Sequence, residues 1–158
     1  MVLEEVYGID DLDICHIHNS IKDGEVILGH GNYEKKREAK LNKIEAQELY
    51  EDKVSAIYSV LSDYYEKTEK ETSRIIFLNK NFFNKLQNVE QVTIIGHSLG
   101  SVDIPYFNEI VKQAPKIKQW RIVDLNYNDY LYKASILKPI IAPTSSIEFI
   151  ESNNFFDL

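Results

Sequence analysis

Apolar side chains recur at spacings of three and four residues through the middle of the chain, with charged side chains between them. The first series begins near Ile44 and comprises Ala46, Tyr50, Val54, Ile57, Leu61 and Tyr64. This period places the apolar positions on one face of an amphipathic helix. A second series after the polar stretch 68–73 comprises Ile75, Leu78, Phe82 and Leu86. The pattern predicts a helical pair at about 44–87, with the second helix over roughly 72–87.

Shorter apolar runs alternate with helical patterns in the second half of the chain. Strands are predicted at 92–95, 120–123 and 146–150, and helices at 103–114 and 130–137. Pro105 fits the first of these helices only in its first turn, where no backbone donor is lost. Strand, helix, strand, helix, strand predicts an α/β fold with a mainly parallel, Rossmann-like sheet flanked by helices. Nearer the start, 12–18 and 26–28 are predicted as two short strands joined by a turn.

Composition narrows the class of protein. The chain has 158 residues with 44% hydrophobic side chains, which suits a single domain with its own core. A formal net charge of −7 argues against a broad nucleic-acid surface. The basic run around Lys35-Lys36-Arg37 is interleaved with glutamates and is interpreted as a solvated face. One cysteine and no apolar run of membrane-spanning length lead us to expect a cytoplasmic protein without disulfides.

All four histidines lie in compact motifs: His16-Ile17-His18, Gly29-His30-Gly31 and Gly96-His97-Ser98. Histidine can ligate a metal or transfer a proton near neutral pH, and glycine lets a backbone approach a ligand closely. Three such motifs near predicted strand ends favour a pocket over isolated turns. A zinc site built from His16, His18 and His30 is an alternative, although the spacing is not specific to metal binding.

The segment Gly96-His97-Ser98-Leu99-Gly100 matches the nucleophile-elbow pattern G-x-S-x-G between a predicted strand and a predicted helix. Taken alone, it predicts a serine hydrolase. No histidine follows Ser98, so a catalytic triad would need a non-standard order along the chain. The alternative is a glycine-rich turn whose backbone donors and following helix hold an anion.

The stretch 92–110, VTIIGHSLGSVDIPYFNEI, resembles the phage abortive-infection AbiH family, whose pattern has GHSL, an aspartate, a proline and an aromatic residue. His16-Ile17-His18 and Ile27-Leu28-Gly29-His30-Gly31 resemble earlier elements of the same family, in the same order. The likeness extends from about 13 to 150, with Asn19 where the family usually has glycine. It implies a single domain that corresponds to the carboxy-terminal half of a larger AbiH-like protein.

The AbiH family is distantly similar to sirtuin-like NAD-binding domains, and this similarity implies roles for particular residues. His18 would be the general base, and Ser98 would contact a ribose or phosphate. Gly96 and Gly100 would allow close approach, and Asp103 would bind a ribose hydroxyl unless it only caps its helix. Gly29, His30 and His97 would complete the pocket for NAD or another nucleotide that contains ADP-ribose.

Three functions therefore remain open after the sequence analysis. The resemblance favours an intracellular phage-defence protein with a nucleotide pocket. The second is a serine hydrolase that uses Ser98. The third is a non-catalytic interaction module or inactive fragment, in which self-association covers exposed apolar surface.

Overall fold

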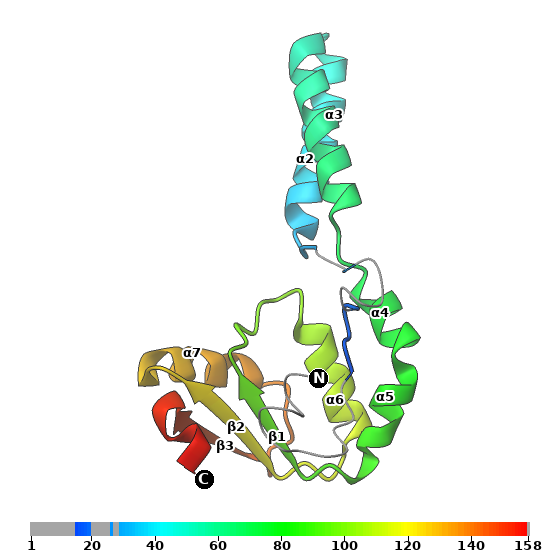
Figure 1. Cartoon of the computed structure of the whole chain (residues 1–158). Helices are drawn as coiled ribbons and strands as arrows, with labels where there is room; N and C mark the ends of the chain where they lie inside the picture. Colours follow the sequence, from blue (N-terminus) through cyan, green and yellow to red (C-terminus); the bar gives the residue numbers. More distant parts are fainter. Residues whose placement is uncertain (1–14, 20–25, 27–28, 158) are drawn as a thin grey trace.

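A computed structural model describes residues 15–19, 26 and 29–157, which form an α/β body and a projecting helical arm (Figure 1). The strands are β1 (Gln91–Ile95), β2 (Gln119–Asp124) and β3 (Ser146–Glu151). The helices are α2 (Tyr33–Glu48), α3 (Asp52–Lys67), α4 (Thr72–Leu78), α5 (Lys80–Asn84), α6 (Ile104–Gln113) and α7 (Tyr127–Leu137). Two short 3-10 helices, η1 (Lys85–Asn88) and η2 (Ser152–Asp157), precede β1 and follow β3.

The strands form one parallel sheet in the order β1-β2-β3, and α6 and α7 are the crossover helices between successive strands. The register pairs Ile94 with Ile122 and Ile122 with Phe149. Partners in a sheet point to the same face, so each aligned row presents its side chains to one side. The predicted α/β fold with a parallel sheet and flanking helices is confirmed.

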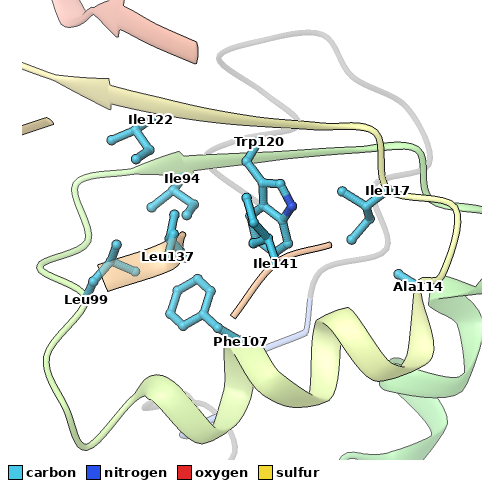
Figure 2. Packing of buried hydrophobic residues seen from close by; sticks show 9 residues of the cluster. All are labelled: Ile94, Leu99, Phe107, Ala114, Ile117, Trp120, Ile122, Leu137 and Ile141. Carbon is cyan, nitrogen blue, oxygen red and sulfur yellow. The ribbon is translucent and has the colours of Figure 1, made fainter. Parts of the chain in front are cut away.

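The core lies on the face of the sheet that α6 and α7 cover (Figure 2). Trp120 and Ile122 of β2 are almost fully buried against Phe107 of α6 and Leu137 of α7. Burying a side chain of this size stabilises the fold by about 1.5–3 kcal/mol. The opposite face carries the buried Val123 and also polar side chains, among them Arg121, whose Nε lies 2.9 Å from a carboxylate oxygen of Glu148. The alternation along β2 therefore decides which face receives the helices.

The helical arm consists of α2 and α3, which among the described elements contact only each other. Figure 1 shows the pair standing away from the sheet. The predicted pairing of a helix from about 44 with a helix over 72–87 is wrong, because the chain turns at 49–51 and the basic run belongs to α2. The segment from 72 to 84 instead packs on α6 as α4 and α5.

The turn between α2 and α3 interrupts the helix although the apolar spacing of the sequence continues through it. Tyr50 has a φ of 56° and occupies the left-handed position that usually takes glycine. The Glu51 N–H donates to the Ala46 carbonyl at 2.8 Å, and the Tyr50 N–H donates to that of Gln47 at 3.2 Å. This pair of bonds is a Schellman motif. No glycine or proline marks it, so the apolar pattern alone could not locate the turn.

Two segments join the arm to the body, and they lie side by side. His30 and Glu69 form a parallel β-bridge, in which the His30 N–H donates to the Thr68 carbonyl at 3.0 Å. The expected strand over 12–18 is wrong where the structure describes it, because 15–19 form a turn closed by the Asn19 N–H on the His16 carbonyl. The remainder of the two expected strands lies outside the described residues. No helix of the described part is long and apolar enough to cross a bilayer.

Replacing Tyr50 by glycine is expected to stabilise the arm by up to about 1 kcal/mol. The substitution removes a left-handed non-glycine residue, which costs roughly 1–2 kcal/mol. Part of this gain is lost, because glycine raises the conformational entropy of the unfolded chain. Urea unfolding followed by circular dichroism measures the change. Tyr132→Gly, at an exposed position inside α7, is the matched control and should lose about 1 kcal/mol. Equal losses in both variants would contradict this account of the turn.

Candidate functional site

The loop from 96 to 103 leaves the carboxyl end of β1 and leads into α6. Gly96 has a φ of 63°, and Leu99 has a φ of 54°. The Leu99 side chain is 1% exposed and sits in the sheet core, whereas the neighbouring Ser98 is exposed. Burial of Leu99 offsets its backbone strain and fixes the loop over the end of β1.

A buried ion pair joins this loop to the arm. We call the bridged segments around His30 and Glu69 the neck of the arm. Lys70 directly follows the neck, and its Nζ lies 2.6 Å from Oδ1 of Asp103, immediately before α6. The side chains are 7% and 18% exposed, so both charges are largely removed from water. The same ammonium lies 5.4 Å from the centre of the Tyr106 ring, over its face. Lys70 therefore has a compensated charge in a nearly closed environment.

His97 lies on the other side of the same carboxylate. Its Nδ1 accepts a hydrogen bond from the Leu99 N–H at 2.9 Å, and its Nε2 is 3.6 Å from Oδ2 of Asp103. An Nδ1 that accepts a hydrogen bond carries no proton, so the proton of the neutral ring is on Nε2 and faces Asp103. Burial lowers the pKa of His97, and the nearby Lys70 adds to this effect against the attraction of Asp103.

His18, which lies far from the other residues along the sequence, completes a cluster with Lys70, His97, Asp103 and Tyr106. Its Nε2 lies 3.1 Å from the hydroxyl of Tyr106, and the two rings meet edge to face. Burial, followed by the positive charge of Lys70, lowers the pKa of His18. Burial and the negative charge of Asp103 raise the pKa of Tyr106 to about 12. At neutral pH the pair is therefore a neutral imidazole beside a neutral phenol.

The structure thus brings together His18, His97 and Asp103, three of the residues that the sequence analysis singled out. It adds Lys70 and Tyr106, to which that analysis gave no role. Tyr106 occupies the aromatic position after Pro105 in the motif, whereas Lys70 lies in a polar stretch that gives no sign of burial. Among these side chains the neutral imidazole of His18 can accept a proton, whereas the Lys70 ammonium is already paired with Asp103.

Ser98 lacks the surroundings of a catalytic nucleophile. Within the described part of the chain no hydrogen bond joins its hydroxyl to a histidine. A nucleophile elbow puts its serine on the strained residue of a sharp turn directly before a helix. Here the left-handed residues are Gly96 and Leu99, and α6 begins only at Ile104. The geometry gives no support to the serine hydrolase alternative.

Gly29 and His30 lie at the neck of the arm. A Cβ on Gly29 would come within 2.8 Å of the Thr68 carbonyl oxygen, so this glycine permits the two neck segments to meet. His30 Nδ1 accepts from the Asn32 N–H, and Nε2 lies 2.7 Å from the Thr68 hydroxyl. That hydroxyl gives its own proton to the Tyr64 carbonyl, so His30 donates through Nε2. Both ring nitrogens of His30 are therefore engaged.

The proposed metal site is not formed in the described part of the chain. None of its His, Cys, Asp and Glu side chains gather in a group of three or more that could hold an ion. Of the three histidines in question, His30 has both nitrogens engaged and His18 is paired with Tyr106. The described residues therefore give no support to the zinc alternative.

Three hollows that described residues line lie away from the five side chains of the cluster. One of about 630 Å³ opens between α7 and the segment before β3, where Tyr130, Ala134 and Ile141 are among its lining residues. Two smaller hollows run along the seam of the arm. At the β1–α6 loop itself, Gly96 and Ser98 are exposed.

Comparison with known families gives one match. The model of the family described as "Bacteriophage abortive infection AbiH" matches residues 1–124, which include the loop and the cluster. The chain belongs to the AbiH family. No curated protein and no solved structure matches the chain. The resemblance noted in the sequence is thereby confirmed, and it assigns this AbiH chain to a family associated with abortive infection by phage.

The AbiH site should make folding stability depend on pH. Because the pKa of His97 is lowered in the folded state, the unfolded chain binds more protons below the ordinary value of 6.5. The free energy of unfolding is therefore expected to fall as the pH drops through 6.5 toward the lowered pKa. His97→Gln should flatten this slope and leave the part due to His18, whose pKa is also lowered. Urea titrations across this range measure it, and identical slopes in both proteins would contradict the expectation.

The buried pair is expected to behave as a unit. Lys70→Met and Asp103→Leu should each lower the free energy of unfolding by roughly 3 kcal/mol, because each leaves a charge buried without its partner. The double variant should lose clearly less than the sum. Lys118→Met, which removes half of an exposed pair with Glu90, is the control and should cost less than about 1 kcal/mol. Additive losses at Lys70 and Asp103 would refute coupling between them.

Proposed function

We propose that this AbiH chain acts in abortive infection by binding a nucleotide that contains ADP-ribose, such as NAD, at the β1–α6 loop. The convergence of His18, Lys70 and His97 on the loop that carries Ser98 is the observation that supports this proposal. Ligands of open parallel sheets bind outside the carboxyl ends of the strands, where a following helix presents its amino terminus. The loop from 96 to 103 occupies such a position.

Each residue has a role in the proposed complex. The exposed Ser98 hydroxyl bonds a ribose or phosphate oxygen, and the exposed Gly96 leaves room for the ligand beside the backbone. Gly100 follows Ser98 in the same loop. His18 is the residue that could accept a proton from the bound ligand, since its lowered pKa keeps the imidazole neutral at physiological pH. Asp103 holds Lys70 and faces His97, so that it positions both basic groups.

Thermal shift with NAD and with ADP-ribose tests the proposal. Either ligand, when present at one hundred times its dissociation constant, should raise the stability of the wild-type chain by about 2.7 kcal/mol. Ser98→Ala and His18→Ala should show a smaller shift relative to their own ligand-free melting temperatures. Ser101→Ala, which removes another exposed hydroxyl from the same loop, should keep the full shift.

The same proteins distinguish the alternatives. Absence of any shift with both ligands would overturn the nucleotide proposal. Labelling of Ser98 by a fluorophosphonate probe would favour the serine hydrolase instead, because such probes react only with an activated serine. A protein that neither binds the ligands nor reacts with the probe would be an interaction module.

A further inference from the structure

The His97 imidazole holds the peptide between Ser98 and Leu99 in an orientation that only the neutral ring supports. Its Nδ1 accepts a hydrogen bond from the Leu99 N–H at 2.9 Å. A protonated imidazole carries a proton on both nitrogens and has no lone pair left to accept with. Protonation of His97 would therefore set an N–H of the ring against the Leu99 N–H, two donors with no acceptor between them.

The ring of His97 is held in place from its other side. Its Nε2 faces Oδ2 of Asp103 at 3.6 Å, and the ring meets that of Phe107 edge to face. A positive charge on the imidazole strengthens its attraction to the Asp103 carboxylate. The side chain is 37% exposed, so a proton from solvent reaches it without any opening of the fold. The response to protonation therefore falls on the peptide, because the ring has gained a reason to stay.

The peptide between Ser98 and Leu99 is free to rotate in its present setting. Leu99 has a φ of 54°, a left-handed value that is strained for a residue with a side chain. Half a turn of this peptide plane, with both Cα atoms in place, takes φ of Leu99 to an ordinary negative value and leaves its side chain in the core. In the described part of the chain no backbone N–H donates to the Ser98 carbonyl. The rotation therefore gives up only the hydrogen bond to His97.

We propose that protonation of His97 flips the peptide between Ser98 and Leu99. The Ser98 carbonyl then accepts a hydrogen bond from the protonated Nδ1, and the Leu99 N–H turns away from the ring. An acceptor takes the place of a donor, so each protonation state of His97 has its own hydrogen-bonded form of the loop. The switch lies within the AbiH motif, and it does not depend on nucleotide binding.

Burial and the charges around His97 set the pH at which the loop changes. Burial has the largest effect and lowers the pKa of His97 from 6.5. Among the described groups, Asp103 raises this pKa, whereas Lys70 and Lys133 of α7 lower it. His18 is the remaining titratable neighbour, since the charge of His97 also lowers the pKa of His18. The flip is therefore expected below pH 6.5, while both lysines keep their charges.

Nuclear magnetic resonance of the isotope-labelled chain tests the switch. At neutral pH the Leu99 amide nitrogen and His97 Nδ1 should show scalar coupling across their hydrogen bond. Leu99 should also give a strong cross-peak between its own amide and α protons, which a positive φ brings close together. Both signals should fade with the protonation of His97. The ratio of flipped to original loop should rise about tenfold for each pH unit below the midpoint.

His30 provides a control within the same chain. Its Nδ1 accepts a hydrogen bond from the Asn32 N–H at 3.2 Å, the same spacing along the chain as between His97 and Leu99. Asn32 already has a negative φ of −78°, so protonation of His30 should break this bond without a change in the sign of φ. In His97→Gln, which has no titrating group at this position, the Leu99 signals should not change with pH.

Three results would overturn the proposal. In the first, the Leu99 amide does not change while His97 titrates, or it changes equally in His97→Gln. In the second, the hydrogen bond is lost but φ of Leu99 stays positive, so that the ring has moved instead of the peptide. In the third, the amide of Ile122 in the middle of the sheet loses its folded signal before His97 titrates, so that the loop has no transition of its own.

Discussion

The ion pair between Lys70 and Asp103 connects every functional part of the molecule. Lys70 directly follows the bridge that closes the neck of the arm, and Asp103 ends the loop that carries the family motif. Neither charge is tolerable in its buried setting without the other. The pair therefore holds the arm, the loop and α6 in one arrangement, and the two histidines are placed around it. Their lowered pKa values follow from the same burial and from the same ammonium.

The loop at the end of β1 shows how one apolar residue positions its polar neighbours. Leu99 enters the core and takes up a left-handed backbone conformation, which leaves Ser98 in solvent and lets His97 accept a hydrogen bond from the Leu99 N–H. In this AbiH loop the left-handed residues are Gly96 and Leu99, whereas in a nucleophile elbow with the same five-letter pattern the serine itself is strained. The serine hydroxyl is therefore exposed rather than held against a histidine.

The arm follows a different packing rule from the body. In the sheet core, large apolar side chains such as Trp120 are buried, whereas in the arm Ala39, Ala46 and Ser62 are buried and Ile57 and Val60 are exposed. An isolated pair of helices gains little from so polar a seam, and its cross-helix ion pairs, such as Lys40 with the half-exposed Glu66, contribute modestly. The β1–α6 loop and the arm are thus separate parts of the molecule, and Lys70, which follows the arm, is paired with Asp103 of the loop.

The sequence by itself determined the parallel sheet, its crossover helices and three members of the cluster, because the alternation of strand and helix and the spacing of the motif are local patterns. It did not locate the turn at Tyr50, since the apolar period runs on through a left-handed residue that is not glycine. It also did not reveal Lys70 or the structural use of His30. Burial of a lysine and the hydrogen bonds of an imidazole depend on residues far away in the chain. Only the tertiary structure decided that Asp103 would lie beside Lys70 and that Ile57 and Val60 of α3 would be exposed, because both outcomes depend on which segments of the chain pack together.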